Sequence, residues 1–211
     1  ECVAIDSLPF FEDFESQPTG SSNLHDFAYC WHRYNNGTTY FGYPYVSSSA
    51  SYNHTPSGNK GLYWDNASSS SSGYGDQMIV IAPPIDTTVI EMNNLMVSFW
   101  ATASSTSYHP EFLVGIMTDP NDPNTFQEIE HCRNIGTSWT QFEVPTAGFE
   151  GFGNYVAIKA AGQSSYWYAY VDDIKIDAMQ EEALETFADA EPIEEEIEEA
   201  KDDYLVASLA K

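Results

Sequence analysis

Apolar residues in this chain recur at every second position or in short continuous runs, and no strong helical period is present before residue 178. Both patterns are typical of β-strands, the first half-buried and the second fully buried. Turn-forming residues such as Asn35-Asn36-Gly37 separate the runs. Nine or ten short strands at this spacing predict a two-sheet antiparallel sandwich. The predicted strands are residues 9–16, 27–34, 61–65, 78–85, 94–101, 111–118, 126–131, 138–144, 155–160 and 166–177.

The last predicted strand, 166–177, carries acidic residues inside an apolar run. Alternation places Asp172 on the same face as Ile174 and Ile176, and Asp173 on the opposite face. A carboxylate held against a core is costly unless something neutralises it, and a bound cation is the simplest solution. The alternative is that Asp172 lies at the rim of the strand and is hydrated.

The first predicted strand has a similar mixture of aromatic and acidic residues. Alternation places Asp13 and Glu15 on one face and Glu12 on the other. We expect the first and last strands to lie side by side and to bind a calcium ion between them. The acidic stretch 119–124 is rich in Pro and Asn, and it lacks the glycine and the final glutamate of an EF-hand loop. A turn is the preferred interpretation there.

The composition limits the classes of partner. The chain has 32 acidic and 7 basic residues, a formal net charge of −25, which argues against nucleic acid and anionic membrane surfaces and favours cation binding. No apolar run of 18 residues occurs, so membrane insertion is not expected. The low lysine content and the abundance of Ser, Thr, Asn and Tyr predict a protein that is secreted or exposed on a cell surface.

The cysteines and the absence of catalytic motifs in the sequence argue against a disulfide framework and against an enzyme. Cys2, Cys30 and Cys132 are too few for a disulfide framework and show no C-x-x-C spacing, so one bridge can form and its pairing stays open. The sequence contains no Gly-x-Ser-x-Gly motif, and its five histidines occur singly. We therefore expect a protein that is not an enzyme. Trp31 is predicted to be a core residue.

Aromatic residues with polar neighbours are candidates for sugar binding, because sugars are held by exposed aromatic faces. The candidates are Tyr43, Tyr45, Trp64 and Trp167. Each of them can equally pack in the core or at its rim. The expected partner is a glycan or a host or matrix protein.

After residue 177 the composition changes. Residues 178–211 contain twelve acidic and two basic residues. Pro192 is suited to a first helical position, and apolar residues recur after it at three- and four-residue steps. This tail is either an amphipathic helix that docks on the sandwich or on a partner, or a disordered acidic linker.

Several segments together resemble the cleaved-adhesin domain family, known from gingipain adhesin regions and from cell-surface proteins of Bacteroidetes. The chain is more distantly similar to MAM domains and to jelly-roll carbohydrate-binding modules. The resemblance covers residues 8–177 and leaves 178–211 outside it. The segments that carry it are residues 8–15, the stretch around Trp31, and residues 82–86, 95–100, 138–142 and 170–174.

The resemblance implies a jelly-roll sandwich with calcium near the paired termini, working outside the cell as an adhesion or binding module, alongside other domains of a larger protein. The family's glutamate in the first strand matches Glu15, and its aspartate pair matches Asp172 and Asp173. Asp13 is added because it shares the face of Glu15. The alternative function is a structural or assembly domain with the acidic tail as a docking helix.

Overall fold

The computed structural model describes residues 2–20, 27–35, 43–49, 53–55, 58–65, 78–105, 110–161 and 167–180. The chain divides into two compact units, Glu1–Met179 and Gln180–Lys211. The predicted acidic tail, 178–211, lies outside the described residues apart from its first three, so the tail helix and the disordered linker both stay predictions. Within the described part, no helix is long and apolar enough to cross a membrane.

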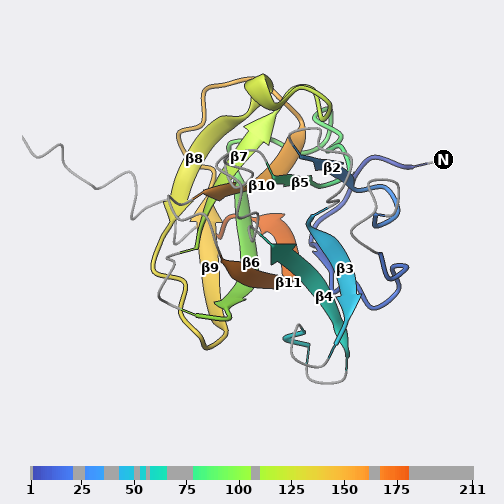
Figure 1. Ribbon diagram of the computed structural model, residues 1–211. Helices are drawn as coiled ribbons and strands as arrows, with labels where there is room; N and C mark the ends of the chain where they lie inside the picture. Colours follow the sequence, from blue (N-terminus) through green and yellow to red (C-terminus); the bar gives the residue numbers. More distant parts are fainter. Residues whose placement is uncertain are drawn as a thin grey trace, which may run out of the picture. The chain divides into compact units, whose positions relative to one another are not determined.

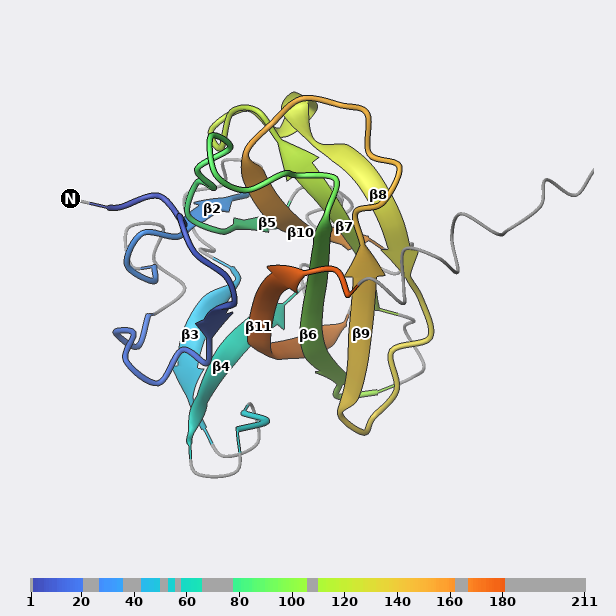
Figure 2. The same ribbon diagram turned by 180° about the vertical axis from the view of Figure 1, so that it is seen from behind.

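Six strands form the first sheet: β1 (Phe10–Glu12), β3 (Tyr45–Ser48), β4 (Lys60–Asp65), β6 (Leu95–Ala103), β9 (Thr140–Pro145) and β11 (Tyr168–Ala178). All pairings are antiparallel, in the order β3-β4-β11-β6-β9. β4 pairs with the first part of β11, and β1 pairs with Ile174 to Ile176 further along it. The predicted neighbourhood of the first and last strands is therefore confirmed (Figures 1 and 2).

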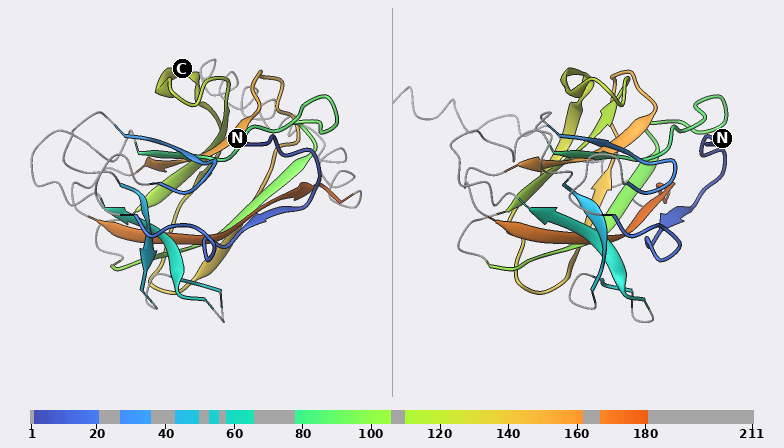
Figure 3. Two further views of the ribbon diagram at one scale, coloured as in Figure 1. Left: turned by 90° about the vertical axis from the view of Figure 1, so that its right-hand side faces the viewer. Right: turned by 45° about the vertical axis from the view of Figure 1, so that its right-hand side comes forward.

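Five strands form the second sheet: β2 (His32–Tyr34), β5 (Ile79–Ile81), β7 (Glu111–Met117), β8 (Gln127–Cys132) and β10 (Tyr155–Ala161). They pair antiparallel in the order β2-β5-β10-β7-β8. Figure 3 shows the two sheets as stacked layers. The predicted fold class, an all-β jelly-roll sandwich of two antiparallel sheets, is confirmed.

The core lies between the two sheets. Alternate residues of β6 from Leu95 to Ala103 are buried in it, as the two-residue period of a strand requires. Phe112 of the second sheet contacts three rings of the first layer, with centroid distances of 5.0 Å to Trp64, 6.3 Å to Phe99 and 6.2 Å to Trp167. These edge-on contacts join the two sheets.

The N-terminal segment is fixed to the sandwich at two points. Cys2 and Cys30 form a disulfide, which settles the pairing that the sequence left open, and Cys132 is a free, buried thiol. Ile5 forms a parallel bridge with Ile85. Trp31 is buried in the core cluster, as predicted.

The acidic stretch after β7 is a turn. Asp119 accepts hydrogen bonds from the backbone N–H of Asn121, and Asp122 accepts one from the N–H of Asn124. A short 3-10 helix, Pro123–Thr125, follows. The turn interpretation is confirmed, because these carboxylates close the bend on their own backbone.

Candidate binding site

A β-bulge in β11 lies at the predicted acidic pair. Asp172 pairs with Trp100 and Lys175 pairs with Ser98, so β11 contains one residue more than β6 between these two pairs. Asp173 has a φ of 50° in the left-handed region, which aspartate tolerates better than most residues. An extra residue with a strained backbone is the usual form of a bulge, and it changes the face on which later residues lie.

The bulge changes which residues of β11 face the core. Val171 and Ile174, three positions apart, are both buried in the core cluster. Asp172 lies instead on the outer face of the sheet, opposite Trp100. The predicted common face of Asp172 and Ile174 is therefore wrong, because the inserted residue interrupts the two-residue period.

Asp172 is nevertheless fully buried, because residues 53–55 cover it. Residues 53–55 and 58–60 are called the latch segment below. The Asp172 carboxylate accepts hydrogen bonds from the backbone N–H groups of His54 at 2.7 Å, Thr55 at 3.3 Å and Asp173 at 2.8 Å. Asp172 therefore attaches the latch segment to the outer face of the first sheet.

Asp173 binds the same two residues through their side chains. Its Oδ2 lies 2.6 Å from Nδ1 of His54, and its Oδ1 accepts a hydrogen bond of 2.5 Å from the Thr55 hydroxyl. The His54 ring stacks on Trp100 with a centroid distance of 3.9 Å and meets the edge of Trp139 at 5.5 Å. The aspartate pair thus holds a His-Trp-Trp cluster in place.

The carboxylate of Asp172 gives the domain a specific pH dependence. Burial raises its pKa from 3.8 to about 7, because desolvation outweighs the hydrogen bonds from the latch segment and from Asp173. The folded state then binds the proton more tightly than the unfolded state. The contribution of Asp172 to stability is therefore largest below the unfolded pKa of 3.8 and decreases as the pH rises towards 7.

We expect Asp172→Asn to remove this dependence. Urea unfolding of both proteins with a metal chelator at pH ~4.5 and ~7.5 measures it. The variant should gain stability relative to the wild type as the pH rises, because only the wild type then has to carry a buried charge. A difference between the two proteins that does not change with pH would contradict the assignment.

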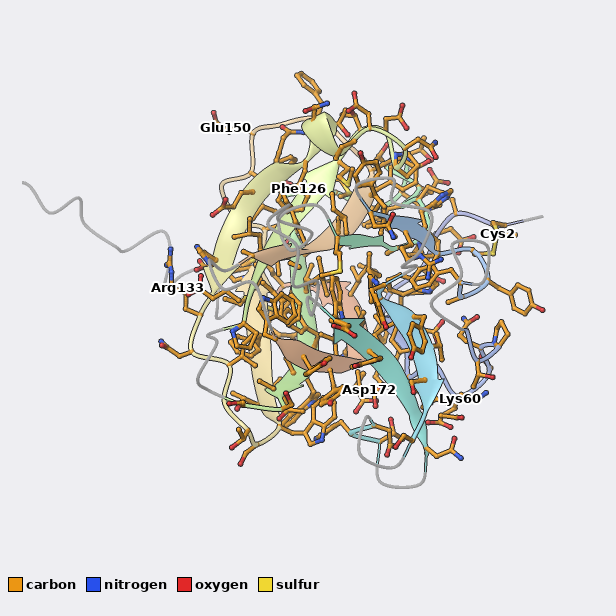
Figure 4. The ribbon with its side chains drawn as sticks, in the orientation of Figure 1. Cys2, Lys60, Phe126, Arg133, Glu150 and Asp172 are labelled. Carbon is orange, nitrogen blue, oxygen red and sulfur yellow. A yellow bond between two sulfur atoms is a disulfide. The ribbon has the colours of Figure 1, made fainter. Side chains whose placement is uncertain are left out.

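Glu15 fixes the other end of the latch segment. Its Oε1 accepts hydrogen bonds from the N–H groups of Asn59 at 2.8 Å and Lys60 at 2.7 Å. The Lys60 ammonium donates to the backbone carbonyls of Glu15 at 2.8 Å and Gln17 at 2.7 Å. A Cβ at Gly58 would collide with the Glu15 carboxylate, so this close approach requires glycine. Figure 4 labels Lys60 on β4 and Asp172 on β11.

Three of the four acidic residues predicted to bind calcium contact the latch segment, and the fourth does not. Asp172 and Asp173 hold its first part, Glu15 holds its last part, and Asp13 accepts a hydrogen bond from the N–H of Glu15 within its own turn. Among the described residues, no three His, Cys, Asp or Glu side chains form a group that could hold a metal. The carboxylate oxygens of the four acidic residues are of the type that calcium prefers as ligands.

Five tyrosines lie together on the outer face of the first sheet and are called the tyrosine face. Tyr45 is directly opposite Tyr63, and Tyr63 is directly opposite Tyr170, so the three form a row across β3, β4 and β11. The Tyr63 ring lies 5.5 Å from Tyr45 and stacks on Tyr170 at 5.6 Å. Tyr43 and Tyr168 complete the face at 5.7 and 6.0 Å from Tyr63.

Asp65 adds a carboxylate beside the tyrosine face. The Tyr63 hydroxyl donates a hydrogen bond of 3.4 Å to it. Burial and, after it, the charge of Asp65 raise the pKa of both Tyr43 and Tyr63. Their hydroxyls are protonated at neutral pH and are hydrogen-bonded to the Asp65 carboxylate.

Trp64 and Trp167, two of the four predicted ligand residues, are core residues. Both are fully buried, and the Nε1 atoms of both lack a hydrogen-bond partner. Alternation explains the error, because Tyr63 and Tyr168 are their immediate neighbours and point to the outer face. The sequence reasoning missed Tyr63 and Tyr170, and the alternation of 61–65 and 166–177 contained the signal for both.

No family model and no curated protein sequence matches the chain. The solved structures that match it in fold include three cleaved adhesin domains of Lys-gingipain, and those named K1 and K3 come from Porphyromonas gingivalis W83. The K1 domain is 17% identical, covers 82% of this chain and 100% of its own length, and has a TM-score of 0.58. The K2 domain is 14% identical over 80% and 98%, with a TM-score of 0.58, and the K3 domain is 13% identical over 80% and 98%, with a TM-score of 0.53.

The chain has the fold of the cleaved adhesin domains. The resemblance inferred from the short segments is thus confirmed at the level of the fold. These identities are too low to transfer a ligand or a residue role.

Proposed function

We propose that this domain is a non-catalytic binding module that recognises a glycan through its tyrosine face. The observation that carries the proposal is the row of Tyr45, Tyr63 and Tyr170 across three adjacent strands. Aromatic rings pack against the apolar faces of sugar rings, while hydroxyl and carboxylate groups bind sugar hydroxyls. The tyrosine face and Asp65 supply both kinds of group in one place. The fold shared with adhesin domains supports a role in binding.

The state of the acidic residues supports a non-catalytic role. Asp172 and Glu12, the two carboxylates of the described residues whose pKa is raised, are both buried and accept hydrogen bonds from neighbouring groups of the fold. A glycosidase needs a pair of carboxylates that reach the substrate from two sides. These two residues are positioned to hold structure.

A panel of immobilised glycans tests the proposal with the full chain. Tyr45→Ala and Tyr170→Ala should each weaken the binding of any retained glycan at least tenfold, about 1.4 kcal/mol, with unchanged melting temperature. Phe152→Ala is the matched control, because this aromatic residue is 84% exposed outside the tyrosine face. Undiminished binding by both tyrosine variants would overturn the site. An empty panel from the folded protein would favour a structural or assembly domain.

We also propose a structural calcium ion at Asp172 and Asp173, with Glu15 as a further ligand and Asp13 as the weakest candidate. Asp172 is fully buried, and no Lys or Arg side chain of the described residues binds it. A buried carboxylate without a positive partner is stabilised by a cation. Calcium would have to replace hydrogen bonds of the latch segment, so its binding should be linked to the conformation of that segment.

We further propose that the domain works outside the cell, on a cell surface or secreted. The Cys2–Cys30 disulfide supports this location, because such bonds persist in oxidising compartments. The net charge of −25 would also limit adhesion to anionic surfaces. The partner is then a glycan or a protein of that environment.

A further inference from the structure

A pocket lies away from the tyrosine face, at the N-terminal end of the chain. It occupies about 400 Å³ between the N-terminal residues 3–7, the strand β1, residues 29–31 and Pro83. It is called the N-terminal pocket below. Its volume is at the lower end of the range for sites that enclose a small ligand, and it is large enough for one long side chain.

The walls of the N-terminal pocket are fixed by covalent and backbone bonds. The Cys2–Cys30 disulfide closes one end (Figure 4 labels Cys2). The N–H of Ile5 donates to the carbonyl of Pro84 at 2.8 Å, and the N–H of Asp86 donates to the carbonyl of Ile5 at 2.8 Å. A pocket with walls already in place loses little conformational entropy when it binds a ligand.

The rim of the N-terminal pocket is aromatic and exposed. Val3 is 77% exposed, Phe11 54% and Tyr29 72%, and these are three of the five large apolar side chains found exposed in the described part. Trp31 and Phe10 lie deeper, with ring centroids 6.2 Å apart. Exposed apolar residues gathered at one pocket indicate a binding site more strongly than the same residues scattered singly.

Two charged side chains of the described residues line the N-terminal pocket, and both are acidic. Asp6 lies at the rim, and Glu12 is buried in the wall. Within the described residues, Glu12 accepts hydrogen bonds from three neutral groups, the N–H of Phe14 and the side chains of Gln17 and Trp31. Among the residues that the structure describes, no Lys, Arg or His lines the pocket. A buried carboxylate beside aromatic faces attracts a cation.

We propose that the N-terminal pocket binds a cationic side chain, of lysine or arginine, presented by a protein partner. The aliphatic stem packs against Phe11 and Tyr29, and the charged end points to Glu12 and Asp6. Lys175 stands opposite Phe11 in the β-sheet register, and it is already paired with Asp177 at 2.6 Å. The site is independent of the tyrosine face and of the proposed glycan.

Titration of the full chain with Nα-acetyl-lysine methylamide, followed by two-dimensional NMR, tests the site. The side-chain N–H of Trp31 donates to Glu12 and is the reporter. We expect a saturable shift of this signal and no shift with the norleucine analogue, which has the same stem without the charge. Equal shifts with both compounds, or no saturable shift with lysine, would overturn the proposal.

Variants at the exposed rim complete the test. Phe11→Ala and Tyr29→Ala should each weaken the lysine derivative several-fold and the double variant at least tenfold, while Val89→Ala, which changes a side chain 64% exposed elsewhere, should have no effect. Well-dispersed spectra of each variant show that the fold is intact. Unchanged binding by the double variant would contradict the site even if the wild type binds lysine.

Discussion

Replacing Trp64 with alanine is expected to lower the free energy of unfolding by about 4 kcal/mol, the usual range for a large aromatic residue in a core. The Trp64 ring is fully buried and lies 5.0 Å from Phe112 of the opposite sheet. Its removal leaves a cavity between the two layers. For a domain of this size the melting temperature should fall by roughly 10 °C. Thermal unfolding followed by circular dichroism measures the change.

Tyr45→Ala is the matched control for Trp64→Ala. Tyr45 lies two strands from the centre of the sheet on the outer face, so its loss should change the free energy of unfolding by no more than about 0.5 kcal/mol, too little to move the melting curve. The two variants should therefore separate: Trp64→Ala loses stability, and Tyr45→Ala loses glycan binding. A Trp64→Ala protein that melts like the wild type and no longer binds glycan would show that this ring belongs to a surface site.

Calcium is expected to raise the melting temperature if it binds at Asp172, Asp173 and Glu15. At a few hundredfold excess over the dissociation constant, calcium raises the free energy of unfolding by about 3 kcal/mol. For a domain of this size that is a rise on the order of 10 °C over the protein in chelator. The physical reason is the buried carboxylate of Asp172, which lacks a positive partner among the described side chains.

Two variants make the calcium measurement specific. Asp172→Asn should melt at the same temperature with calcium and with chelator, because the central ligand is lost. Glu150→Gln changes an exposed carboxylate in the loop after β9 and should keep the full response. If the wild type melts identically in both conditions, the calcium proposal fails, and the latch segment is held by hydrogen bonds alone.

The sequence predicted the sandwich because alternation is local. Alternating residues, the near-continuous apolar run of β6 and the turn residues between the runs identified most of the strands. The first and last strands were placed side by side from their shared composition, and β1 does pair with β11. The predicted strand 9–16 is shorter than expected, because Phe14 adopts a φ of 59° and ends it.

The acidic site was only partly predictable, because its geometry depends on distant residues. The bulge at Asp173 replaces the regular alternation with a left-handed residue, and no glycine or proline marks it in the sequence. His54 bonds to Asp173 across 119 positions of the chain, and a local pattern contains no information about such a contact. The sequence showed that Asp172 is a carboxylate within an apolar strand, but it did not show that the latch segment buries this residue.

The tyrosine face was also only partly predicted from the sequence. Tyr43 and Tyr45 were chosen for their polar, aromatic surroundings, and both lie on the tyrosine face. Trp64 was chosen on the same ground, as an aromatic residue with polar neighbours, and it is in the core instead. Burial is decided by the face on which a residue lies, so alternation is a better guide than residue type within a strand.

The most direct test of the central claim compares glycan binding by the wild type, Tyr45→Ala, Tyr170→Ala and Phe152→Ala on one panel. We expect the wild type and Phe152→Ala to retain the same glycan and both tyrosine variants to lose at least tenfold in affinity, about 1.4 kcal/mol, with unchanged melting curves. Equal retention of that glycan by all four proteins would contradict the account, because the tyrosine face would then not be where the glycan binds.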